Sequence, residues 1–111
     1  MSGPVLVLVE REDGRISLVS REALTVAARL GSEIHALVLG GVDDAVLADA
    51  RDYGVAVVHE ATDEELGRYS AAAWASALVA CVKTTNATAV VAGGTPRSTE
   101  VLAHLAARCA V

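Results

Sequence analysis

The chain has 111 residues, of which 53% are hydrophobic and only 3% are aromatic, with no Phe. This content of small aliphatic residues is enough for one compact core and excludes an intrinsically disordered chain. The formal net charge is −5 and Lys83 is the only lysine, so the sequence has no basic stripe that would bind nucleic acid or an acidic membrane surface.

The N-terminus and the apolar runs favour a cytoplasmic protein. Residues 1–4 have no basic segment of the kind that begins a signal peptide. The longest apolar run, residues 71–82, is interrupted by Ser76 and is shorter than the roughly 20 residues that a membrane-spanning helix needs. We therefore expect cytoplasmic localisation, no membrane insertion and no nucleic-acid partner.

The first part of the chain predicts a buried strand followed by a helix. Residues 5–9 are a continuous run of Val and Leu, which is typical of a strand covered on both faces. The pair Asp13–Gly14 marks a turn, and residues 16–19 are a candidate for a short extra strand. A helix is predicted over residues 21–30, with Gly31 as its stop. Its expected buried face consists of Leu24, Ala27 and Ala28.

Two further strands and a helix follow. Apolar runs predict strands over residues 34–39 and 55–58, and a helix is predicted between them over residues 43–53. Asp43 or Asp44 is a suitable N-cap for this helix, and Gly54 can end it. Its expected buried face consists of Val46, Ala50 and Tyr53.

The last part of the chain predicts a loop, a helix, a strand and a final helix. Residues 61–69 are polar and predict the longest loop, in which the acidic Asp63–Glu65 is most simply a solvated turn. The helix predicted over residues 70–85 is apolar on nearly all sides, with Trp74 as its largest side chain. Either this helix is buried entirely within the domain, or its second face meets another chain or domain. A strand over residues 89–92 and a helix over residues 96–108 follow, with Thr95 as the N-cap and Pro96 at the first helical position.

The alternation β-α-β-α-β-α-β-α predicts the fold class. We expect an α/β protein, namely a three-layer α/β/α domain with a parallel, doubly wound sheet and right-handed crossovers. No composition shift marks a boundary, so residues 1–111 are predicted to form one domain. The chain stops directly after the last predicted helix, where a further strand is expected, and we interpret it as a piece of a longer protein.

In open α/β sheets, ligands bind beyond the carboxyl ends of the strands, at the point where the strand order reverses. There, the segment Gly93–Thr95 can either hold a phosphate at the start of the last helix or simply turn the chain and let helix and strand pack closely. The first strand ends in residues 10–14, which contain three carboxylates and no glycine-rich phosphate motif. This end of the sheet therefore argues against nucleotide binding.

The histidines and cysteines show no catalytic or metal-binding spacing. His35, His59 and His104 are far apart in the sequence, although the fold could bring two of them together. Cys81 and Cys109 lie among apolar residues and are predicted to be buried, reduced thiols. We accordingly assign no catalytic, cofactor-binding or metal-binding residue from the sequence.

Several stretches, taken in order, resemble the N-terminal domain of the electron transfer flavoprotein α subunit. They are residues 5–10, 21–31, 34–40, 53–58, 63–69 and 92–108, and the alanine-rich helix after residue 69 fits the same pattern. The resemblance covers essentially the whole chain and depends on the order of the pieces rather than on one motif. One departure is Pro96–Glu100, where the family commonly has a Gly-Arg or Gly-Lys pair.

The resemblance implies a Rossmann-like fold of the adenine-nucleotide α-hydrolase type and a division of labour. In this family FAD is bound by a C-terminal domain, which is absent from this chain, so no cofactor is expected here. The N-terminal domain is a scaffold without catalytic residues that contacts the β subunit. The whole protein is an electron carrier rather than an enzyme, and it passes electrons from dehydrogenases, such as acyl-CoA dehydrogenases, to the respiratory chain. The alternative is a stand-alone nucleotide-binding module resembling the universal stress proteins, of whose glycine-rich phosphate loop Gly93–Gly94 is only a fragment.

Overall fold

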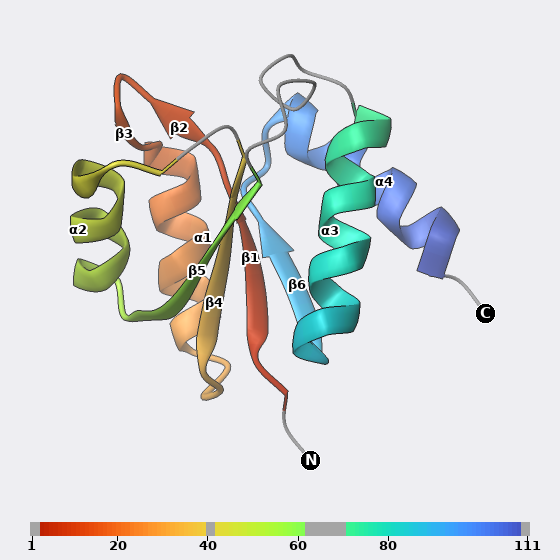
Figure 1. Cartoon of the computed structure of the whole chain (residues 1–111), viewed down its shortest axis with the longest axis horizontal. Helices are drawn as coiled ribbons and strands as arrows, with labels where there is room; N and C mark the ends of the chain where they lie inside the picture. The colour runs from red at the N-terminus through yellow and green to blue at the C-terminus, as the bar shows by residue number, and fades with distance from the viewer. Residues whose placement is uncertain (1–2, 40–41, 62–70, 110–111) are drawn as a thin grey trace.

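The computed structural model of the chain describes residues 3–39, 42–61 and 71–109. They form a parallel sheet with helices on both faces (Figure 1), which confirms the predicted three-layer α/β fold. The sheet has the order β5-β4-β1-β6, with strands β1 Val5–Val9, β4 Ile34–Leu39, β5 Val55–Ala61 and β6 Ala89–Ala92. The helices are α1 Leu18–Ala28, α2 Asp44–Asp52, α3 Ala71–Thr85 and α4 Pro96–Cys109.

The sheet divides the core into two halves. Side chains alternate between the two faces of a strand, so Val5, Val7 and Val9 of β1 pack with α1 and α2, whereas Leu6 and Leu8 pack with α3 and α4. All five are at most 2% exposed. This two-sided burial explains why the strands are continuous apolar runs.

The chain between β1 and α1 differs from the prediction. The short extra strand predicted before the first helix is present but lies earlier than residues 16–19. It is β3 Arg15–Ile16, which pairs antiparallel with β2 Arg11–Glu12, and α1 then begins at Leu18. The helix begins early because the hydroxyl oxygen of Ser17 accepts a hydrogen bond from the Ser20 N–H at 3.2 Å and caps it. Leu24 and Ala27 are buried as predicted, but Ala28 is exposed.

The α2 region follows the prediction closely. Asp43 is the N-cap, since its carboxylate accepts a hydrogen bond from the Val46 N–H at 3.0 Å. Gly54 follows the helix with φ +81°, a conformation that glycine adopts without steric cost. Strand β5 continues to Ala61, so this residue, predicted as the first of the loop, belongs to the strand. The remainder of that loop, including Asp63–Glu65, lies outside the described residues.

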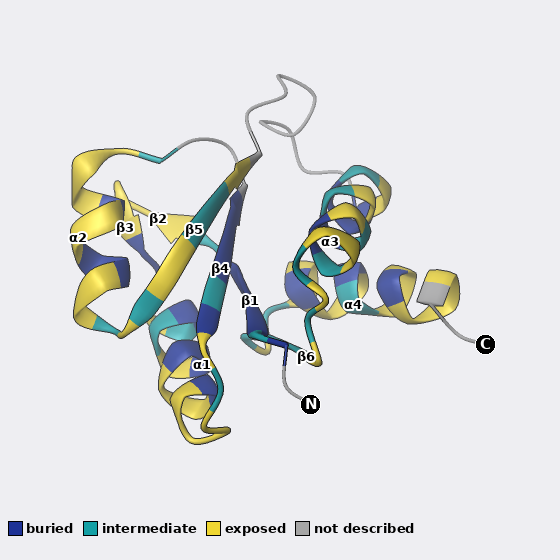
Figure 2. Ribbon diagram, turned by 60° about the horizontal axis from the view of Figure 1, so that its bottom comes forward, coloured by how far each residue is buried: buried dark blue, intermediate teal, exposed yellow. Residues whose placement is uncertain are grey.

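Helix α3 buries one face within the domain, while Ala72, Ser76, Ala80, Lys83 and Thr84 on its other face are exposed. Trp74 is 8% exposed and packs in the core half formed with α4. The guanidinium of Arg108 on α4 donates hydrogen bonds to the Ser76 hydroxyl at 2.6 Å and to the Ala72 carbonyl at 3.3 Å. Figure 2 shows α3 and α4 side by side on one face of the sheet. The large exposed apolar side chains among the described residues lie on other elements, so the predicted second face of α3 is exposed but is not formed by large apolar side chains.

Among the described residues, no helix is long and apolar enough to cross a membrane.

Candidate functional site

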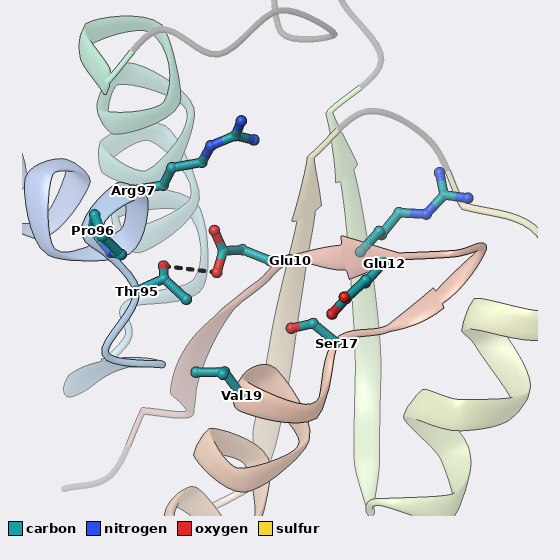
Figure 3. Close-up of a pocket in the computed structure, with 8 residues that line it drawn as sticks. Glu10, Glu12, Ser17, Val19, Thr95, Pro96 and Arg97 are labelled. Carbon is teal, nitrogen blue, oxygen red and sulfur yellow. Dashed lines mark hydrogen bonds between the residues drawn. The ribbon is translucent and has the colours of Figure 1, made fainter.

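A cleft of about 400 Å³ lies between the carboxyl ends of β1 and β6, where the strand order reverses. Figure 3 shows side chains from the first strand's end, from α1 and from the start of α4 converging on it. The lining residues are Glu10, Arg11, Glu12, Ser17, Val19, Thr95, Pro96 and Arg97. The cleft is therefore the ligand position that the fold predicts.

Glu10 is held at the centre of this cleft. Its carboxylate accepts a hydrogen bond from the Thr95 hydroxyl at 2.9 Å (Figure 3), and its backbone N–H donates to the Ser20 hydroxyl at 2.8 Å. The Thr95 oxygen also accepts a hydrogen bond from the Ser98 N–H at 3.1 Å and so caps α4. The carboxylate of Glu10 thus lies beside the N-terminus of α4, where the helix dipole favours a negative charge.

The double role of Thr95 leads to a first prediction. Thr95→Ala removes both the cap of α4 and the hydroxyl that binds Glu10, and we expect it to lower the free energy of unfolding by about 1 kcal/mol in urea denaturation. Thr95→Ser keeps the hydroxyl and should retain most of the stability. Thr99→Ala, at an exposed position of the same helix, is the control and should change stability by less than about 0.5 kcal/mol. Equal stability of the Thr95→Ala and Thr99→Ala proteins would contradict the capping role.

The two glycines before α4 have different surroundings. A Cβ atom on Gly93 would lie 2.1 Å from Cγ1 of Val19 on α1, whereas a Cβ on Gly94 would meet nothing within 4 Å. Gly93 is therefore explained by the close packing of β6 against α1, which is one of the two interpretations that the sequence left open.

The histidines are placed apart from the cleft. His35 on β4 and His59 on β5 contact each other, with 2.9 Å between Nδ1 of His35 and Nε2 of His59, while His104 is exposed on α4. Partial burial, and secondarily the neighbouring His35, lower the pKa of His59. Sequence spacing missed this pair because the contact depends on the pairing of β4 with β5. The described residues contain no group of three or more side chains placed to bind a metal ion.

Cys81 is a free thiol on α3, buried as predicted, and this burial raises the pKa of the thiol. The side chain of Cys109 lies outside the described residues. A buried, protonated thiol is a poor nucleophile, so Cys81 contributes packing rather than chemistry.

Comparisons with known proteins agree with this geometry. The electron transfer flavoprotein α subunit of Syntrophomonas wolfei is 30% identical to the chain over 76 residues, which are 68% of this chain and 24% of that protein. The chain thus matches about a quarter of the length of this relative. The universal stress protein from Archaeoglobus fulgidus is similar in structure, with a TM-score of 0.56 over 93% of this chain and 92% of that one. At 17% identity this similarity shows the fold alone.

The profile of one family, described as the electron transfer flavoprotein domain, matches residues 5–111, which is nearly the whole chain. The match spans both core halves and the cleft residues described above. The chain therefore belongs to the electron transfer flavoprotein domain family.

Proposed function

We propose that this chain is the N-terminal scaffold domain of an electron transfer flavoprotein α subunit, which pairs with the β subunit and binds no redox cofactor itself. In this proposal the complete protein carries electrons from dehydrogenases, such as those acting on acyl-CoA, to the respiratory chain. Its FAD is bound by a part of the α subunit outside this domain. The observation that carries the proposal is the match of the electron transfer flavoprotein domain to residues 5–111. The carboxylate of Glu10 in the cleft supports the part of it that concerns the cofactor.

The position of Glu10 disfavours a nucleotide in the cleft. In this fold a phosphate would be stabilised by the N-terminus of the helix after the fourth strand of the parallel sheet. Here the carboxylate of Glu10 is bonded to Thr95 at that N-terminus and already supplies the negative charge. A phosphate placed next to it would be repelled by a like charge a few ångströms away. The cleft thus supports a scaffold more than the alternative, a nucleotide-binding module of the universal stress protein type.

Calorimetric titration separates the two functions. We expect the chain to bind neither FAD nor AMP nor ATP at ligand concentrations up to about 1 mM, the range of weak affinities near −4 kcal/mol. Glu10→Gln keeps the shape of the side chain and removes its charge. A gain of AMP binding in this variant would show that the negative charge of Glu10 prevents the unaltered chain from binding the nucleotide. Stoichiometric FAD binding by the unaltered chain would overturn the cofactor-free role, and tight ATP or AMP binding would favour the alternative.

Pairing with the β subunit is tested by co-expression. The chain, produced together with the affinity-tagged β subunit of the same organism, should co-elute with it at a 1:1 ratio in size-exclusion chromatography. The tagged β subunit alone on the same column is the control for its own oligomeric state. A folded chain that elutes separately would contradict the pairing.

A further inference from the structure

Two histidines form a hydrogen bond between β4 and the edge strand β5, away from the cleft. In the pairing of these strands, His35 is opposite Val57 and Leu37 is opposite His59, so both imidazoles project from the same face as diagonal neighbours. Nδ1 of His35 lies 2.9 Å from Nε2 of His59, whereas the ring centres are 5.1 Å apart. Because the nitrogens are much closer than the centres, the two rings point toward each other along the bond.

A carboxylate on the far side of the first ring fixes which nitrogen donates. An oxygen of Glu33 lies 2.6 Å from Nε2 of His35. An ionised carboxylate can only accept, so this nitrogen carries a hydrogen, and in the neutral ring Nδ1 of His35 is an acceptor. The bond between the rings is therefore donated by Nε2–H of His59 to Nδ1 of His35.

This bond accommodates one added proton but not two. A proton on Nδ1 of His59 leaves the shared hydrogen in place and makes the bond charge-assisted. When both rings are protonated, all four nitrogens carry hydrogens, so two N–H groups face each other and no acceptor remains. The two positive rings, with centres 5.1 Å apart, also repel each other. Full protonation therefore removes the bond and replaces it with a repulsion.

The surroundings of the pair offer little to offset a second charge. His35 is 12% exposed at its side chain and His59 is half-buried, so water solvates their charged forms poorly. Strand β1 has only Val and Leu, and α2 lies on the opposite face of the sheet. Helix α3, on the same face, has the buried thiol of Cys81 and the exposed Lys83, neither of which is an anion at neutral pH. In the described part of the chain, the anion that contacts the pair is Glu33.

We propose that the bond between His35 and His59 is a proton-sensitive clasp, which holds β5 on β4 while the two rings have at most one added proton and releases β5 when both are protonated. Strand β5 can open without the rest of the sheet, because it lies at the edge, pairs with β4 alone and has a register shift near its start (Figure 1). This inference is independent of the proposed electron-carrier role.

The direction of the pH effect agrees with the geometry. Burial, and secondarily His35, lower the pKa of His59 below its ordinary value of 6.5. A histidine with a lowered folded-state pKa stabilises the fold fully above the ordinary value, and this contribution is lost as the pH falls through the folded value. Acid therefore loosens β5 rather than tightening it.

The test is hydrogen exchange of the backbone amides, followed by NMR at pH 7 and at about pH 5, where carboxyl groups are still ionised, and corrected for the intrinsic pH dependence of exchange. Protection of the amides in β5 should fall roughly tenfold relative to those in β1, as expected for the loss of one hydrogen bond to a charged group. His59→Gln should abolish this fall, because the amide of Gln offers both a donor and an acceptor and does not titrate. His104→Gln, at an exposed position on α4, is the matched control and should respond to acid like the unaltered chain.

A second measurement does not depend on the folding of the variants. In an NMR titration of the unaltered chain, the ring signals of His35 and His59 should both respond to each of two coupled steps, whereas those of His104 should titrate in one step. Circular dichroism of each variant confirms that it is folded. The proposal is overturned if acid leaves the relative protection of β5 unchanged, if the folded His59→Gln protein loses this protection as the unaltered chain does, or if the three histidines titrate independently.

Discussion

Gly93→Ala is expected to lower the free energy of unfolding by about 2–3 kcal/mol, within the range for overpacked sites. The added Cβ would lie 2.1 Å from Cγ1 of Val19 and 3.1 Å from the Val19 carbonyl oxygen, so both a side chain and the backbone of α1 are in the way. Val19 cannot simply turn aside, because its β-branched side chain has one strongly preferred rotamer in a helix. Urea denaturation of the variant and the unaltered chain measures the loss.

Two variants make this prediction specific. Gly94→Ala is the matched control, since its Cβ would enter open space, and it should change stability by less than about 0.5 kcal/mol. Combining Gly93→Ala with Val19→Ala removes the worst contact and should restore part of the lost stability, while the contact with the carbonyl oxygen remains. A Gly93→Ala protein as stable as Gly94→Ala would show that close packing is not the reason for the glycine.

This pair of glycines illustrates what the sequence could and could not decide. From the sequence, the Gly-Gly pair could either hold a phosphate or turn the chain before the last helix, and the structure has a bend at Gly94. The reason for a glycine at position 93 depends on the residue packed against it. That residue is Val19, which is 74 positions earlier in the chain. The same holds for Glu10: its acidity alone argued against a phosphate, but its bond to Thr95 required the adjacent placement of β1 and β6.

Local signals explain the parts of the fold that the sequence predicted well. Continuous apolar runs predicted the positions of β1, β4 and β6. Candidate caps, Asp43 or Asp44 for α2 and Thr95 for α4, predicted where these two helices begin. The predictions that were inexact concern segments whose structure depends on contacts with residues distant in the sequence. The two-residue strands of the hairpin β2–β3 are too short for any periodicity. The hairpin is held by hydrogen bonds to Asp49 of α2, a contact that sequence spacing does not reveal.

Replacement of Asp49 by alanine should lower the free energy of unfolding nearly as much as Gly93→Ala. The carboxylate of Asp49 accepts hydrogen bonds from Nε of Arg15, at 2.7 Å, and from Nη2 of the same residue. It accepts a third from the buried Ile16 N–H at 3.2 Å. Asp49→Ala leaves the Ile16 N–H without an acceptor and detaches β3 from α2. A buried unsatisfied donor costs roughly 1–3 kcal/mol, and we expect a loss of about 2 kcal/mol in urea denaturation. Asp52→Asn, an exposed aspartate of the same helix, should lose less than about 0.5 kcal/mol.

The pH dependence separates the charge of Asp49 from the shape of its side chain. The hydrogen bond from Arg15, and then that from Ile16, lower the pKa of Asp49 below its ordinary value of 3.8, although burial opposes them. A carboxyl group with a lowered folded-state pKa stabilises the protein fully above its unfolded value, and this contribution is lost as the pH falls through the folded value. The difference in unfolding free energy between the unaltered chain and Asp49→Asn should therefore be constant from pH 7 down to about pH 5 and shrink below about pH 4. A difference that stays constant down to pH 2 would mean that the ionised carboxylate does not hold the hairpin on α2, and that only the loss of an acceptor atom matters there.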